Sequence, residues 1–280
     1  MLQQRLNLGS PANRSHPLNR GLVSWYMSLP AQSRGLNVRD LFSHNLGTLT
    51  ASATWTNRHQ AGGYGSWTFG ASGQRIAITE SNSSLQFADT LTLSAWVRLD
   101  TGTSFAQPCG YCQPSGSTGG YGFYILTGIN FFCSVYNGSY STFSTFTADS
   151  KWHHIVGTYN RLASVLDIYV DGVKGVAGIG SSIPGASLSY TSCIPAISSQ
   201  GGGFASWPGA VDDVRFYNRS LSASEIWALY DQSRRGYPEA LNWIRTPGML
   251  AQAAGAPAST LFRRSLYRRS GSRGVMNAAA

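Results

Sequence analysis

Apolar and polar residues alternate along several short segments of the chain, most clearly in residues 91–99, LTLSAWVRL. Every second residue from Leu91 to Leu99 is apolar, so these side chains share one face of an extended strand. The other face carries Thr92, Ser94, Trp96 and Arg98. This pattern predicts a strand that buries one face in a hydrophobic core.

The same signal recurs in residues 152–159, WHHIVGTY, and in residues 165–170, VLDIYV. Asp171-Gly172 follows the second segment and precedes Val173-Lys174, which is the arrangement of a two-residue type I′ hairpin turn. Strands recur with turn signals about every eight to twelve residues, a spacing typical of an antiparallel β-sandwich.

Residues 206–230, SWPGAVDDVRFYNRSLSASEIWALY, combine a strand pattern with the start of a helix. The period of two between residues 211 and 217 places Asp212 on the same face as Val214 and Phe216. Asp213 and Arg215 then lie on the opposite face of this predicted strand.

A helix is predicted directly after this strand. Ser222 and Glu225 have the S-x-x-E spacing of a capping box, and Leu221 and Ile226 are placed to form a hydrophobic staple. These four residues predict a short helix that begins after Ser222.

Composition agrees with a mostly β protein. The chain has 280 residues, of which 42% are hydrophobic and only 12% charged, and it contains 32 glycines. This balance favours many strands joined by tight turns, although length alone leaves open one large domain or two small ones. Residues 101–122, which hold the CGYC segment, are interpreted as a turn-rich insertion. The four cysteines are interpreted as free thiols.

Positive charge is concentrated at the two ends of the chain. Residues 1–20 carry +3, residues 234–280 carry +7, and residues 21–233 carry −1. The chain therefore divides into an extended N-terminal arm (1–20), a neutral β-sandwich (21–232) and a basic C-terminal tail (233–280). Such ends suit docking on an anionic surface, and nucleic-acid binding by the neutral body is not expected. The candidate docking residues are Arg263, Arg264, Arg268 and Arg269.

No segment is as apolar or as long as a membrane span, and residues 1–20 have no run typical of a signal peptide. We therefore expect a soluble protein located in a virion or at an extracellular surface, and cytoplasmic before assembly.

Four segments, LTLSAWVRLD, KWHHIVGTYNR, LDIYVDGVKGV and GAVDDVRFYNRSLSASEIWALY, occur in this order. In that order and spacing they resemble the laminin-G-like, concanavalin A-like lectin/glucanase domain family, in particular its bacterial and phage branch. The resemblance covers residues 21–232 and implies an all-β fold: a two-sheet antiparallel jelly-roll sandwich with a short C-terminal helix. Members of this family include glycan-binding modules, adhesion modules and glycosidases, so fold leaves function open.

The resemblance also implies a structural calcium ion. The positions that match the family's site are Asp212, Asp40 and Asn45. A carboxylate on an apolar face needs a metal, a cation or several hydrogen bonds. The alternative is that Asp212 accepts hydrogen bonds from backbone N–H groups at the edge of the sandwich.

Catalysis by the family's glycosidase mechanism is not expected. A retaining glycosidase needs two carboxylates about 5 Å apart, and the family's E-x-D-x-x-E motif is missing from this sequence. The glutamates are Glu80, Glu225 and Glu239. His153 and His154 are neighbours in a strand and cannot converge on one centre, so they favour a structural role. We therefore expect the protein not to be an enzyme.

Tyrosines offer a candidate surface for a glycan or a protein partner, because an apolar ring with a polar tip suits both. The alternative for part of this set is packing in the core and in hairpins. The candidate residues are Tyr111, Tyr121, Tyr124, Tyr136 and Tyr140.

Three functions follow from these observations. The first is a non-catalytic recognition or decoration module of a phage virion, oligomeric in context and docked through its arm and tail on a capsid or tail. The second is a free carbohydrate-binding module, and the third is a glycoside hydrolase with an unrecognised carboxylate pair.

Overall fold

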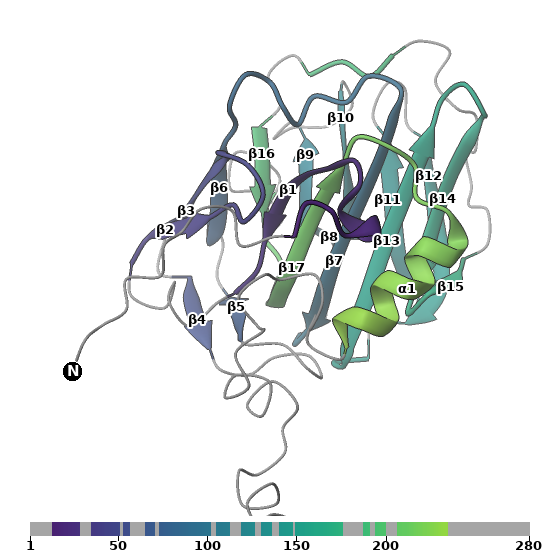
Figure 1. Ribbon diagram of the computed structural model, residues 1–280. Helices are drawn as coiled ribbons and strands as arrows, with labels where there is room; N and C mark the ends of the chain where they lie inside the picture. Colours follow the sequence, from purple (N-terminus) through teal and green to yellow (C-terminus); the bar gives the residue numbers. More distant parts are fainter. Residues whose placement is uncertain are drawn as a thin grey trace, which may run out of the picture.

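The fold is a sandwich of two antiparallel β-sheets with one α-helix outside the first sheet (Figure 1). The computed structural model describes residues 13–28, 35–50, 53–56, 65–70, 73–101, 105–112, 119–126, 130–135, 140–147, 149–175, 187–190, 194–199 and 206–234. This arrangement confirms the predicted two-sheet sandwich and the predicted short C-terminal helix, α1 (Ala223–Ser233). The described residues include no helix long and apolar enough to span a membrane.

The first sheet is centred on β7, which pairs with β13 along its whole length on one side and with β17 on the other. One edge of β17 is shared: its first residues pair with β5 and its last residues with β1. In spatial order the strands are β15 (Val173–Lys174), β14 (Val165–Val170), β13 (Trp152–Asn160), β7 (Thr90–Leu99), β17 (Gly209–Tyr217), β5 (Ser66–Phe69) and β4 (Thr54–Thr56), with β1 (Leu22–Tyr26) beside β17.

The second sheet lies behind the first in Figure 1. In spatial order its strands are β12 (Tyr140–Thr147), β11 (Asn130–Val135), β10 (Gly120–Leu126), β9 (Cys109–Cys112), β16 (Ile194–Ile197), β6 (Arg75–Thr79), β3 (Leu46–Thr50) and β2 (Asn37–Arg39), with β8 (Phe105–Ala106) beside β10.

The CGYC segment is the main difference from the predicted strand pattern. It forms β9, which lies between β10 and β16 within the second sheet rather than in a turn-rich insertion. Gly110 pairs with Gly122, and a Cβ on Gly110 would lie 2.7 Å from the Cα of Gly122. Glycine therefore serves close approach of two strands here, whereas by sequence it indicates a turn. Cys109 and Cys133 are buried in the sandwich. Cys193 and the side chain of Cys112 lie outside the described residues, so the thiol state of the four cysteines stays a prediction.

The main hydrophobic core lies between the two sheets. The apolar face of β7, from Leu91 to Leu99, is buried in it as the alternation predicts. Tyr121 and Phe123 of β10 and Ile76 of β6 enter the same core from the second sheet. Burial of this large apolar area is the main stabilising contribution to the fold.

A β-bulge in β17 changes which side chains face that core. Asp212 pairs with Trp96 and Arg215 with Ser94, so β17 has one extra residue, and Asp213 adopts a left-handed conformation with φ of +51°. Val211 and Val214 both enter the core as a result. The prediction that Asp212 shares a face with Val214 and Phe216 is therefore wrong, because a bulge interrupts the period of two.

A second hydrophobic cluster lies on the other face of the first sheet, under α1. Ile226 and Leu229 of the helix pack there against Val156 of β13 and Tyr169 of β14. Leu18 joins this cluster from η1 (Pro17–Asn19), a short 3₁₀ helix. Leu18 therefore packs against the sandwich, within the segment 1–20 that the sequence predicts as an extended arm, and the predicted division into arm, sandwich and tail stays a prediction.

A buried ion pair lies beside this second cluster. The Asp213 carboxylate accepts hydrogen bonds from Arg215 Nε at 2.9 Å and from Trp25 Nε1 at 2.6 Å. The guanidinium carbon of Arg215 lies 3.9 Å from the Trp25 ring centroid. Both charged side chains have no solvent exposure, so neither charge is screened by water.

We predict that Arg215→Met destabilises the protein by about 3–5 kcal/mol, because it leaves the Asp213 carboxylate buried without its cation. Urea unfolding of the full chain measures this change. The double variant Asp213→Asn/Arg215→Met should recover part of the loss, since it removes both charges together. A double variant less stable than Arg215→Met would contradict this account of the pair.

Candidate functional site

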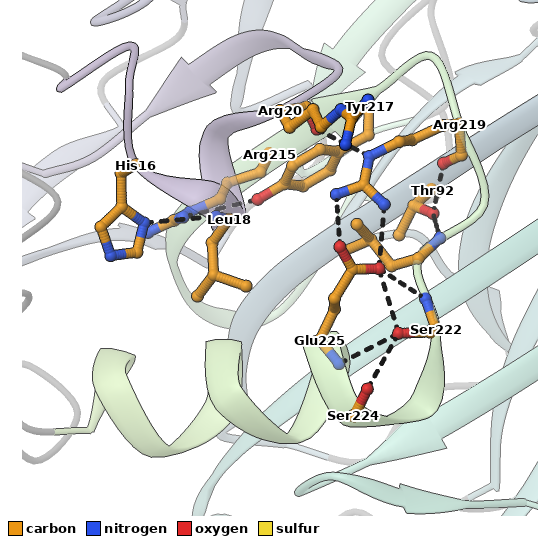
Figure 2. A network of polar contacts seen from close by, with 11 residues as sticks. His16, Leu18, Arg20, Thr92, Arg215, Tyr217, Arg219, Ser222, Ser224 and Glu225 are labelled. Carbon is orange, nitrogen blue, oxygen red and sulfur yellow. Dashed lines mark hydrogen bonds and ion pairs between the residues drawn. The ribbon is translucent and has the colours of Figure 1, made fainter.

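The start of α1 is fixed to the first sheet by a polar network (Figure 2). Ser222 Oγ accepts from the Glu225 N–H at 3.3 Å and Glu225 accepts from the Ser222 N–H at 2.9 Å, which confirms the predicted capping box. Arg219 donates two hydrogen bonds to Glu225, at 2.9 and 2.8 Å, and lowers the pKa of Glu225 to about 2. Thr92 of β7 accepts from the Leu221 N–H at 2.9 Å. The helix is thereby held at a set position on the sheet.

This position presents Trp227 at the surface, where its side chain is 52% exposed. Its ring lies against Gly172 in the turn between β14 and β15: a Cβ on Gly172 would lie 2.5 Å from Trp227 Cε3. Asp171 and Gly172 have φ of +51° and +79°, which confirms the predicted type I′ turn. The adjacent Val173 is also 52% exposed.

Tyr230 supports Trp227 from the side, with 5.6 Å between the ring centroids. It also stacks on Trp96 and on His154, at centroid distances of 5.8 and 6.0 Å. His154 Nε2 lies 2.9 Å from Ser94 Oγ, and burial lowers the pKa of His154 to about 3, so its ring is neutral. We call Trp227, Tyr230, Val173 and the Asp171-Gly172 turn the Trp227 surface.

The Asp171 carboxylate ties the turn to β13. One oxygen accepts from the His154 N–H at 2.9 Å, and the other lies 2.8 Å from His153 Nδ1. His153 Nε2 lies 3.0 Å from an oxygen of Asp149. The two adjacent histidines therefore serve different purposes: His154 supports the aromatic rings, and His153 connects two carboxylates.

Charged side chains around the Trp227 surface are paired with one another. Lys174 Nζ lies 2.8 Å from Asp167, and Arg234 lies 2.9 Å from Asp231. Lys151 Nζ lies 2.6 Å from Asp149. Each of these three cations thus has a carboxylate partner, which limits the attraction of the surface for an anion.

Asp40 and Asn45, two of the three predicted calcium ligands, are joined through Ser24. The Asn45 amide donates to Ser24 Oγ at 3.4 Å, and Ser24 Oγ donates to Asp40 at 2.5 Å. The Asp40 carboxylate also accepts from three main-chain N–H groups and one further hydroxyl: Trp25 N, Phe42 N, Ser43 N and Ser43 Oγ.

Asp212, the third predicted ligand, accepts from the Ser28 N–H at 2.8 Å. This hydrogen bond corresponds to the alternative in which Asp212 accepts from the main chain. The described residues contain no group of three or more His, Cys, Asp or Glu side chains placed to hold a metal ion. As arranged, the Asp40 oxygens already accept from donors of the chain and do not fit a calcium ion. The calcium site that the family resemblance implies at Asp212, Asp40 and Asn45 is therefore put to the thermal-unfolding test below.

The predicted tyrosine surface is not formed as a unit. Tyr111 and Tyr121 are 3% and 1% exposed and belong to the core between the sheets, so their place in a binding surface was predicted wrongly. Their alternation with polar or glycine residues places them on the inward face of β9 and β10. Tyr124 is half-buried and stacks on Phe132 with 5.3 Å between centroids.

The remaining predicted residues lie outside the described part of the chain. Tyr136 lies outside the described residues, and Tyr140 lies in β12, whose side chains are not described. The four candidate docking arginines also lie outside the described residues: Arg263, Arg264, Arg268 and Arg269.

Glu80 forms a hydrogen-bonded carboxylate and hydroxyl pair with Tyr111. Tyr111 donates to Glu80 at 2.5 Å, and Gln86 and the Leu85 N–H donate to the same carboxylate at 2.9 and 3.0 Å. The Tyr111 ring is packed edge-on against Tyr190 at 4.8 Å. The contacts of Glu80 therefore fix the chain between β6 and β7 to the core.

The sequence matches the concanavalin A-like lectin/glucanases superfamily over residues 69–227. The chain belongs to this family. Comparison with curated proteins finds no match. The family name covers both lectins and glucanases, so membership does not exclude catalysis.

Solved structures with a similar fold include a sialidase of Trypanosoma rangeli and the binding domain of botulinum neurotoxin serotype D/C. The sialidase is 18% identical with a TM-score of 0.57, and the match covers 81% of this chain and 36% of the sialidase. The neurotoxin domain is 12% identical with a TM-score of 0.56, over 77% of this chain and 53% of the other. A structure of botulinum neurotoxin type C, described as entering cells through two ganglioside molecules, is 13% identical with a TM-score of 0.56, over 77% and 52%.

This family member thus spans about a third to a half of these similar proteins. They are a sialidase and botulinum neurotoxins, one of which is described as depending on gangliosides for cell entry, rather than capsid or tail components. The prediction of a phage virion decoration module docked on a capsid or tail is therefore wrong. The carbohydrate-binding alternative fits these comparisons better.

We predict that Gly172→Ala destabilises the protein more than Gly73→Ala. Both glycines have positive φ, +79° and +84°, so each substitution strains the backbone at a cost of ~1–3 kcal/mol. Only at Gly172 would the new Cβ meet Trp227, since a Cβ on Gly73 would have no atom within 4 Å. Urea unfolding of both variants isolates the contact with Trp227. Equal losses of stability in Gly172→Ala and Gly73→Ala would contradict a close contact between Gly172 and Trp227.

Calcium binding is tested by thermal unfolding of the full chain with calcium and with chelator. Because donors of the chain already bind the Asp40 oxygens, we predict the same melting temperature in both. A calcium ion that binds the folded chain, supplied at about a hundred times its Kd, would instead raise the free energy of unfolding by about 2.7 kcal/mol. A calcium-dependent rise that Asp40→Asn abolishes would establish the predicted site.

Proposed function

We propose that the protein is a non-catalytic glycan-binding module that holds a sugar ring against Trp227. The observation that carries this proposal is a half-exposed indole held in place by Gly172 on one side and Tyr230 on another. A rigid aromatic side chain offers apolar contact area at a low cost in conformational entropy. The apolar face of a sugar ring fits such a surface, and its hydroxyl groups need polar neighbours.

Polar groups are available at the rim of the Trp227 surface. Asp231 follows Trp227 by four residues on α1, which places the two side chains beside each other on the helix. Lys174 follows the Gly172 turn by two residues, and its side chain is 57% exposed. Carboxylate and ammonium groups accept from and donate to sugar hydroxyls.

The charge pattern favours a neutral sugar over a sialylated one. Lys174 and Arg234 are paired with Asp167 and Asp231, and an incoming carboxylate would have to compete with these carboxylates. An anion binds well where cations or N–H groups are free to meet it. We therefore propose a neutral glycan as the ligand of this surface, encountered outside the cell.

The absence of hydrolysis is part of this proposal. The Glu80 carboxylate accepts hydrogen bonds from Leu85, Gln86 and Tyr111, which favours a structural role for it. The glycosidase alternative would need Glu80 to face a second carboxylate about 5 Å away across the substrate. Release of reducing sugar from a β-glucan panel by the full chain, lost in Glu80→Gln, would revive that alternative.

We predict that Trp227→Ala lowers the affinity for a neutral glycan about tenfold or more, the usual effect of removing an aromatic anchor. A glycan array with neutral and sialylated members identifies the ligand, and calorimetry measures the affinity. Leu162→Ala is the matched control, because Leu162 is 77% exposed in the β13–β14 turn, at the opposite end of β14 from Gly172. An affinity that is unchanged in Trp227→Ala but lowered by a substitution outside the Trp227 surface would contradict the site. A sialylated glycan as the best ligand on the array would contradict the proposed ligand class.

A further inference from the structure

We propose that His153, as a doubly protonated imidazolium held between Asp149 and Asp171, is a positioning residue that sets the Trp227 surface. The Trp227 surface should therefore be more stably ordered at about pH 5 than at about pH 8. The inference concerns the regulation of the proposed glycan site. Only the measurement of sugar affinity rests on the proposed function, because the other measurements follow the turn itself.

The geometry requires two donors on one ring. His153 Nδ1 lies 2.8 Å from an Asp171 oxygen, and Nε2 lies 3.0 Å from an Asp149 oxygen. A carboxylate accepts hydrogen bonds and donates none, and a neutral imidazole has a single N–H. Only the imidazolium therefore donates to both carboxylates, and loss of its proton sets one nitrogen lone pair against a carboxylate oxygen.

The connection from His153 to Trp227 runs through the Asp171-Gly172 turn. The second Asp171 oxygen accepts from the His154 N–H at 2.9 Å, and the Asp171 N–H donates to His154 O at 2.8 Å. Gly172 follows directly and lies against the Trp227 ring. A change in the hold on Asp171 therefore moves the backbone on which the indole rests.

The charged groups facing His153 favour the imidazolium. They are Asp171 from the β14–β15 turn and Asp149 from the segment before β13, and Lys151 lies 2.6 Å from Asp149. From β11, the Phe131 ring contacts His153 at a centroid distance of 6.0 Å and carries no charge. Asp171 raises the pKa of His153 above its ordinary value, an effect that burial opposes and Asp149 reinforces.

The sign of the pH dependence follows from this direction. A histidine whose pKa is higher in the folded state contributes stability that is fully present below its unfolded pKa, about 6.5. That contribution is lost as the pH rises through the higher folded value. The turn and the Trp227 surface should therefore loosen above neutral pH.

The test follows hydrogen exchange of the Asp171 amide in the full chain by NMR, between about pH 5 and about pH 8, the range in which histidine titrates. Protection, corrected for intrinsic exchange, should fall about tenfold as the His153 imidazolium loses one proton, the effect of losing a charged hydrogen bond. His153→Gln should give a protection independent of pH. His44→Gln, at an exposed histidine, should behave as the parent chain does.

A second variant separates a titrating residue from a purely structural one. Asp149→Asn removes one of the two carboxylates and should move the midpoint of the change to lower pH. A protection of the Asp171 amide that does not follow the His153 titration would overturn the proposal. An unmoved midpoint in Asp149→Asn would overturn it as well.

A panel of maltohexaose, cellohexaose and laminarihexaose gives the sugar readout, with affinity expected to fall in parallel with protection as pH rises. Equal affinity at both ends of the pH range, together with a change in protection, would overturn the positioning role while glycan binding stands. A pH-dependent Asp171 amide in a chain that binds none of these sugars or the array glycans would support the role of His153 and overturn glycan binding.

Discussion

The left-handed backbone at Asp213 is the constraint on which both faces of the first sheet depend. The extra residue in β17 lets Val211 and Val214 enter the core between the sheets. It also places Asp213 beside Arg215 and Trp25 on the outer face. Burying this ion pair is costly, and its good geometry and the indole N–H offset that cost. On the same outer face, Ile226 and Leu229 of α1 share a hydrophobic cluster with Trp25, Val156 and Tyr169.

The sequence predicted what depends on regular periodicity and on local turn chemistry. The alternation in residues 91–99, the Asp171-Gly172 turn and the capping box at Ser222 are each confirmed, because each is decided by a few neighbouring residues. The bulge at Asp213 was missed, since a non-glycine residue there gives no local signal. Cys109–Cys112 was missed as a strand because glycine serves close strand contact there.

Most of the candidate site depends on contacts between distant segments, which a single sequence does not show. The helix register offered one signal: once Ser222 is the N-cap, Ile226 and Leu229 form the buried stripe and Trp227 falls beside it. That Trp227 rests on Gly172 depends on the tertiary packing of α1. Tyr111 and Tyr121 were placed on a binding surface for the same reason, because the inward faces of β9 and β10 are known only once these strands are placed in the sheet.

The proposed glycan site is the Trp227 surface, on the outer side of the first sheet. Indole N–H and tyrosine ring signals, followed by NMR as a bound glycan is titrated in, locate the ligand directly. We expect the largest shifts to arise from Trp227 and Tyr230. Largest shifts at Tyr124 and its stacking partner Phe132, on the second sheet, would contradict it.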